Sequence, residues 1–135
     1  MKQIELKKDI EVVYITAKSF PEGVLEAHQT LHSIIPFSKK RQYFGISYPN
    51  TEGVITYKSA AEILNNEEVE KYNLEVFTIK KGNYISAILK DYQKDISLID
   101  KTFKQLLSDP RLDPKGYCLE VYLNEKDMPC MVKIN

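Results

Sequence analysis

The clearest chemical signal in this chain is a carboxylate, Glu120, which lies two positions before Tyr122 in an otherwise apolar run. Because a β-strand alternates its side chains between two faces, Glu120 and Tyr122 share one face. The opposite face is predicted to be core and carries Tyr117, Leu119, Val121 and Leu123. A carboxylate beside an aromatic ring needs water, a cation or a hydrogen-bond donor as its partner. The pattern therefore marks Glu120 as a candidate ligand contact.

A weak internal repeat adds tyrosines to the same side. The segments 14–17 and 84–87 read Tyr-Ile-Thr-Ala and Tyr-Ile-Ser-Ala, and each is expected to open a strand that precedes a helix. If the isoleucines face the helices, alternation directs Tyr14 and Tyr84 to the opposite side, toward a groove.

The hairpin expected after the first helix supplies more residues of this kind. Phe44 is expected to face the helix together with Leu119, which directs Tyr43 and Gly45 to the groove. A five-residue turn would then place Tyr57 opposite Gly45, where the missing side chain leaves room for the ring.

The predicted groove is a tyrosine-rich cup around one acid. Its residues are Tyr14, Tyr43, Gly45, Tyr57, Tyr84, Glu120 and Tyr122. Aromatic ring faces attract cations by roughly 0.5 to 2 kcal/mol each, and a carboxylate supplies the counter-charge. Such a groove suits flat or cationic organic molecules.

Two similar halves are predicted to position these side chains. Helices are expected at about 21–35 and 95–109, the second with Asp95 as N-cap and with Asp100 and Lys104 as a solvent-facing pair. Strand pairs are expected after each helix, at 42–48 with 54–62 and at 116–123 with 128–134, and a polar connector at 65–73 leads to a further strand at 74–79.

These elements predict an α+β fold of duplicated strand-helix-strand-strand units, with an antiparallel sheet, two helices on one side and a central ligand groove. The length fits a single domain, 1–135, with repeat halves at about 8–63 and 74–135.

Composition narrows the function classes. Nineteen basic and nineteen acidic side chains give a net charge of zero, without the basic footprint of a nucleic-acid binder. We therefore expect no direct binding of nucleic acid. Neither an apolar run of membrane-spanning length nor a signal-peptide pattern is present, so we expect a cytoplasmic protein without membrane contact.

Other reactive residue types receive structural interpretations. Cys118 and Cys130 are expected to be reduced thiols, because the predicted hairpin register places Cys130 opposite Val121. His28 and His32 imitate a zinc-protease spacing, but glutamine replaces the catalytic glutamate, so no metal or other cofactor is predicted and His28 is read as a core histidine. The basic run 39–41 is read as a solvated loop.

Three segments together resemble the GyrI-like family, the effector-binding domains of multidrug-responsive transcription regulators and their stand-alone relatives. They are Leu119-Glu120-Val121-Tyr122-Leu123-Asn124 followed by Met131-Val132, the turn Lys81-Gly82-Asn83-Tyr84, and Gln42-Tyr43-Phe44-Gly45-Ile46-Ser47. The resemblance spans about residues 5–134. It implies a central pocket in which the acid matching Glu120 contacts cationic aromatic compounds. This chain differs from the regulators in having no helix-turn-helix domain and no tryptophan.

The combined reading is a stand-alone small-molecule-binding domain that binds or sequesters an amphipathic, aromatic or cationic compound, with Glu120 recognising the charge. Two alternatives stay open. Some relatives hydrolyse reactive natural products with a glutamate and a tyrosine, which here would be Glu120 and Tyr57. Others inhibit DNA gyrase, which would make the protein an interaction module whose partner is unknown.

Overall fold

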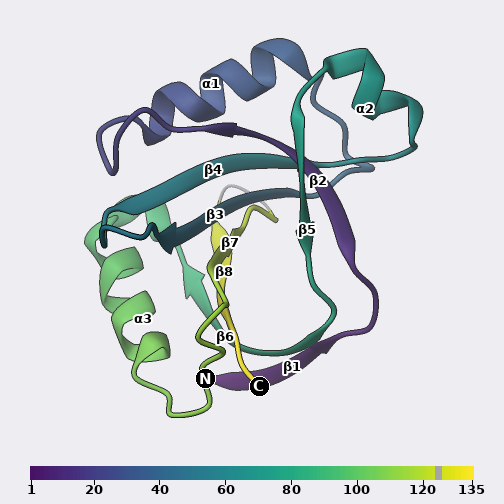
Figure 1. The fold of residues 1–135 in the computed structure, drawn as a ribbon. Coiled ribbons are helices and arrows are strands. Elements are labelled where there is room, and N and C mark those ends of the chain that lie inside the picture. Colours follow the sequence, from purple (N-terminus) through teal and green to yellow (C-terminus); the bar gives the residue numbers. More distant parts are fainter. Residues whose placement is uncertain (124–125) are drawn as a thin grey trace.

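The computed structural model describes residues 1–123 and 126–135, which form one eight-stranded antiparallel sheet with three α-helices (Figure 1). The strands are β1 (Lys2–Leu6), β2 (Ile10–Thr16), β3 (Tyr43–Pro49), β4 (Ile55–Glu62), β5 (Glu75–Ile79), β6 (Gly82–Lys90), β7 (Cys118–Val121) and β8 (Asp127–Lys133). The helices are α1 (Val24–Ile34), α2 (Glu67–Tyr72) and α3 (Ser97–Leu107), and a short 3₁₀ turn, η1, covers Tyr92–Lys94.

The expected hairpin turn at 124–127 lies partly outside the described residues. None of the described helices is long and apolar enough to span a bilayer.

The strand order shows the duplication. The sheet runs β1-β6-β8-β7-β3-β4-β2-β5. Read inward from the two edges, β1 corresponds to β5, β6 to β2, β8 to β4 and β7 to β3. Each half also contributes an edge strand to the other, because β1 pairs with β6 and β5 pairs with β2. The sheet curls around its concave face, and α1 and α3 lie outside it (Figure 1).

The two long helices attach through apolar stripes on the same face of the sheet. Leu31 of α1 and the following Ile35 are buried against β2 and β4, and Leu106 of α3 is buried against β6 and β8. The N-cap of α3 is Ile96 and not the predicted Asp95, which lies one residue earlier and accepts hydrogen bonds from the backbone N–H and the hydroxyl of Ser97. The predicted Asp100–Lys104 pair is confirmed, with 3.0 Å between Nζ and Oδ2.

The predicted sheet faces are right for the first strand of each half and wrong for the hairpins. Ile15 and Ile85 pack on the helix side as expected. Phe44, Ile46, Leu119 and Val121 instead belong to the cluster on the concave face, with Tyr84. The first four residues of β3 are all buried, so both faces are covered there and hydrophobic alternation does not indicate which face meets the helices.

The predicted hairpin registers are also wrong. Tyr57 lies opposite Ser47, and Gly45 lies opposite Ser59. The turn is tighter than predicted, because the Asn50 N–H donates to the Val54 carbonyl and Gly53 adopts a left-handed φ of 82°. In the second hairpin Cys130 lies opposite Glu120, one position from the predicted partner. Both cysteines are free thiols.

The polar connector contains a helix that the sequence analysis read as linker. In α2, Glu68 is buried and accepts hydrogen bonds from both terminal nitrogens of Arg41, at 3.2 and 2.8 Å. Arg41 is only 8% exposed. The reading of 39–41 as a solvated loop is therefore wrong for Arg41, although Lys39 and Lys40 are exposed. A buried charge requires a partner far along the sequence, which local composition does not show.

Candidate functional site

Glu120 of β7 is the acceptor at the centre of a cluster of polar side chains on the helix side of the sheet. The Tyr57 hydroxyl donates to Glu120 Oε1 at 2.6 Å, and the Tyr122 hydroxyl donates to the same oxygen at 2.7 Å. The described residues form no ion pair with Glu120. The carboxylate is therefore held by neutral phenols and not by a basic side chain, which leaves its charge uncompensated.

His28 of α1 extends this cluster away from the sheet. Its Nε2 lies 2.9 Å from the Tyr57 hydroxyl, and its Nδ1 lies 2.5 Å from Ser59 Oγ. Each phenol has a single proton and gives it to Glu120, so His28 Nε2 must be the donor toward Tyr57. Nδ1 then accepts from the Ser59 hydroxyl. With the imidazole neutral, these contacts form an ordered chain of hydrogen bonds that ends on the carboxylate.

The ionisation of the cluster follows from its burial. Burial raises the pKa of Glu120, although the hydrogen bonds from Tyr57 and Tyr122 act in the opposite direction. Burial and the neighbouring Glu120 charge raise the pKa of both phenols, which therefore stay protonated as donors. Burial, assisted by the charge of His32, lowers the pKa of His28 to about 4, in agreement with the neutral imidazole.

Gly45 makes this cluster possible. A Cβ at this position would collide with the Tyr57 hydroxyl and with Glu120 Oε1. Gly45 and Tyr57 are therefore in contact as expected, but in a different register from the predicted one. The ring of Tyr57 reaches the space above Gly45 diagonally, from a position opposite Ser47.

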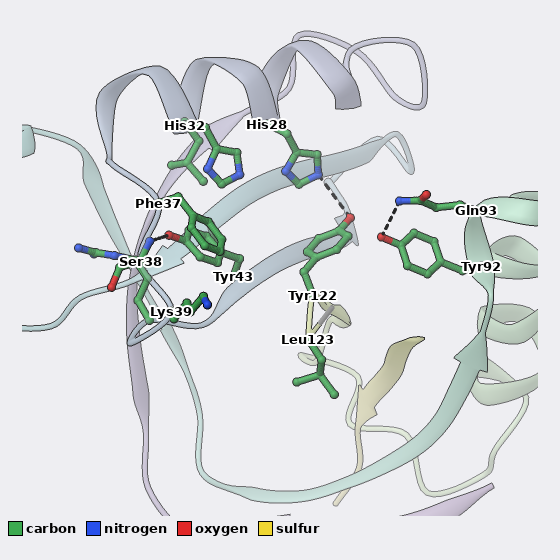
Figure 2. Close-up of a pocket in the computed structure, with 13 residues that line it drawn as sticks. His28, His32, Phe37, Ser38, Lys39, Tyr43, Tyr92, Gln93, Tyr122 and Leu123 are labelled. Atoms are coloured by element: carbon green, nitrogen blue, oxygen red, sulfur yellow. Dashed lines mark hydrogen bonds between the residues drawn. The ribbon is translucent and has the colours of Figure 1, made fainter. Parts of the chain in front are cut away.

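A cavity of about 480 Å³ lies over the outer side of the cluster, beneath α1 and beside η1 (Figure 2). His28 and Tyr122 belong to both the cluster and the cavity wall, with their ring centroids 5.2 Å apart. Phe37 stacks on Tyr43 at 5.5 Å and forms one aromatic end. The remaining lining residues are Leu31, His32, Ser38, Lys39, Arg41, Ala60, Tyr92, Gln93 and Leu123.

The structure brings together most of the predicted site residues and separates two. Glu120, Tyr122, Tyr57 and Gly45 meet in the cluster, and Tyr43 lines the cavity. Tyr14 and Tyr84 do not join them. Both pack with the cluster on the concave face. There Tyr14 donates to Glu75 Oε2 and Tyr84 donates to the Lys80 carbonyl. Both thus lie on the face opposite Glu120, because the hairpin faces were assigned the wrong way round.

Sequence reasoning missed His28 as a site residue. It predicted a hydrogen-bonded core histidine, which is correct as far as its hydrogen bonds go, but the partners are the site phenols. The available signal was the position of His28 next to Ala27 and three residues before Leu31, on the stripe that packs on the sheet. No group of three or more His, Cys, Asp or Glu side chains among the described residues is arranged to hold a metal ion.

Comparison with known proteins supports the fold. No family model and no curated protein matches the sequence. Solved structures match over 99% of this chain. One is an integron cassette protein from the mobile metagenome of Vibrio cholerae, with a TM-score of 0.72, 11% identity and 95% of that chain covered. The second is SAV2435 bound to tetraphenylphosphonium, with a TM-score of 0.67, 13% identity and 93% of that chain covered. The third is a hydrolase from Listeria innocua, with a TM-score of 0.63, 9% identity and 90% of that chain covered. The chain thus has the α+β, curled antiparallel sheet of these proteins.

Proposed function

We propose that the protein binds an amphipathic organic molecule with aromatic and cationic character in the cavity beneath α1, and that Glu120 provides the recognising charge. The observation that carries this proposal is the placement of an uncompensated carboxylate behind an aromatic wall. Ionising Glu120 in the empty site is costly because burial removes water, and a nearby cation restores a favourable balance. His28, Tyr43 and Tyr122 supply ring surfaces that contact the apolar part of such a ligand.

The comparisons support this choice of ligand class. SAV2435, which has a similar fold, was solved with tetraphenylphosphonium, an aromatic cation. The resemblance of the Glu120 strand to the GyrI-like family points in the same direction. In that reading the protein is a stand-alone binding domain that senses or sequesters its ligand.

The test compares two ions of the same shape and opposite charge, tetraphenylphosphonium and tetraphenylborate, by calorimetric titration. We expect the wild-type protein to prefer the phosphonium. Glu120→Gln should weaken phosphonium binding by about 1.5 to 3 kcal/mol, the value of a lost charge-assisted interaction, and leave the fold intact. Glu26→Gln, the same change on the exposed side of α1, is the control and should have no effect. Equal phosphonium affinity in wild type and Glu120→Gln would refute the proposal.

A second candidate function is hydrolysis. The hydrogen-bond chain from Ser59 through His28 and Tyr57 to Glu120 can move protons, and one protein of similar fold is described as a hydrolase. In that case Glu120 activates water and Tyr57 donates a proton to a reactive natural product. Mass spectrometry of a cyclopropane-bearing electrophile after incubation would show a hydrated product. Tyr57→Phe should then abolish turnover while binding persists. Saturable binding without product supports the first function, and the absence of both favours an interaction module.

A further inference from the structure

The cavity has a second polar end, which lies away from Glu120 and carries the opposite electrostatic character. Ser38 and Lys39 line this end beside Phe37 and Tyr43 (Figure 2). No aspartate or glutamate is among the described residues that line the cavity. A cation at this end would therefore lie beside an ammonium group, with no carboxylate of the described residues next to it.

The hydrogen bonds at this end leave donors without acceptors. Tyr43 Oη accepts from the backbone N–H of Ser38 at 2.9 Å, so the phenol proton of Tyr43 remains to be donated. Ser38 Oγ accepts from the backbone N–H of Lys40 at 3.1 Å, so its hydroxyl proton is also free to donate. Neither hydroxyl donates to an acceptor within the described residues.

Lys39 adds a charge to these donors. Its side chain is exposed and forms no ion pair within the described part of the chain, and it extends along the cavity side of the loop (Figure 2). Arg41 behind it is paired with Glu68, yet its Nε is buried without a partner. Two hydroxyl donors and an ammonium group at one end can donate hydrogen bonds to an anionic oxygen of a carboxylate, sulfonate or phosphate group.

We infer that the cavity takes an amphoteric aromatic molecule, with its anionic group at Lys39, Ser38 and Tyr43 and its cationic or electron-poor ring system toward Tyr122 and Glu120. This inference rests on the proposed function and narrows its ligand class from cations to zwitterions. The opposite polarity of the two ends also orients the ligand, because the reversed pose would place like charges together at each end.

The test uses two fluorescent dyes with one xanthene skeleton. Rhodamine 110 is a zwitterion with a free carboxylate, and rhodamine 123 is its methyl ester and a cation. Fluorescence anisotropy titration measures the Kd of each dye for the wild type, for Lys39→Gln and for Lys40→Gln. Lys40 is the matched control, because it is adjacent and exposed but does not line the cavity.

We expect Lys39→Gln to weaken the binding of rhodamine 110 about threefold to fivefold and to change the Kd of rhodamine 123 less than about twofold, so that the ratio of the two Kd values shifts toward the cation. Lys40→Gln should leave both dyes unchanged. Equal effects of Lys39→Gln on the two dyes, or equal effects of the two lysine variants, would overturn the inference while the proposed function stands. If neither dye and no phosphonium binds to the folded wild type, both the inference and the proposed function fail.

Discussion

His28 shows how one side chain sets the proton arrangement of the whole cluster. Because the phenols of Tyr57 and Tyr122 both donate to Glu120, the neutral imidazole donates to Tyr57 from Nε2 and accepts from Ser59 at Nδ1. Burial of the ring, assisted by the charge of His32, disfavours protonated His28 in the native state and lowers its pKa to about 4.

This arrangement predicts a pH dependence of stability. Between the ordinary histidine pKa of about 6.5 and the native value of about 4, the unfolded chain binds more protons at His28 than the folded protein does. Stability from this group is therefore complete above pH 6.5 and is lost as the pH falls toward 4. The free energy of unfolding measured with urea should be lower at pH 5 than at pH 7.5, and His28 should account for about 2 kcal/mol of the difference.

Two variants separate this effect from that of the neighbouring acid. His28→Gln should lose less stability than the wild type between the two pH values. The raised pKa of Glu120 works with the opposite sign, because the folded protein then binds the extra proton. Glu120→Gln should therefore lose more stability than the wild type on acidification. An unchanged pH slope in His28→Gln would contradict the assignment.

Gly45 provides a prediction about close approach. In Gly45→Ala the new methyl group meets the Tyr57 hydroxyl and the Glu120 carboxylate, and we expect a destabilisation of about 1 to 3 kcal/mol in urea unfolding. Tyr57→Phe removes the hydroxyl that collides. The double variant should therefore be more stable than the sum of the two single effects predicts. Simple additivity would show that the collision is relieved in another way.

At the scale of elements, the ion pair between Arg41 and Glu68 fixes α2 and the start of β3 to the rest of the molecule. Arg41 also donates to the Glu62 carbonyl at 2.9 Å, and Glu68 accepts from the Leu64 N–H at 2.7 Å. The pair thus joins the end of β4, the helix and the loop that carries Lys39. This loop forms one end of the cavity, so the pair also positions that end.

Removal of one partner should be costly. Glu68→Gln leaves the Arg41 charge buried without a counter-charge, and we expect a loss of about 3 to 5 kcal/mol in the free energy of unfolding. The double change Arg41→Met with Glu68→Leu should cost much less, because no charge is then buried. The exposed pair Lys104 and Asp100 is the reference, since Asp100→Asn should cost less than about 1 kcal/mol. Equal costs for Glu68→Gln and Asp100→Asn would contradict the role of the buried pair.

At the scale of the whole molecule, the exchange of edge strands joins the two halves. The strand β1 completes the sheet next to β6 of the second half, and β5 completes it next to β2 of the first half. The central pairing of β3 with β7 runs across the middle of the same sheet. Neither half can lose its strands without exposing a sheet edge of the other.

We therefore expect a single cooperative unfolding transition. Val13→Ala lies in the first half and Val132→Ala in the second, and both side chains are 1% exposed. Each variant should be destabilised by about 2 kcal/mol. In each variant, far-ultraviolet and near-ultraviolet circular dichroism should give the same unfolding midpoint, shifted from that of the wild type, because the halves unfold together. Two separate transitions, with each variant shifting only one, would show that the halves are independent.

The sequence by itself determined the types of α1, α3 and the strands β2 to β8, the duplication and part of the site, whereas the edge strand β1 was not predicted. Helical stripes and strand alternation are local signals, and the Glu120–Tyr122 spacing places both side chains on one face in any strand. The helix α2 escaped prediction because its short polar sequence carries no apolar stripe. Its burial depends on a partner, Arg41, 27 positions away.

Only the tertiary structure decided which faces and which distant residues meet. Since the first four residues of β3 are buried on both sides, their alternation is compatible with either orientation, and the wrong choice placed Tyr14 and Tyr84 with Glu120. The turn at Gly53 shifted the register that sequence reasoning assumed. His28 reaches Glu120 through Tyr57 because α1 crosses the sheet above β4. Such contacts arise from packing between elements, which the spacing of residues along the chain does not encode.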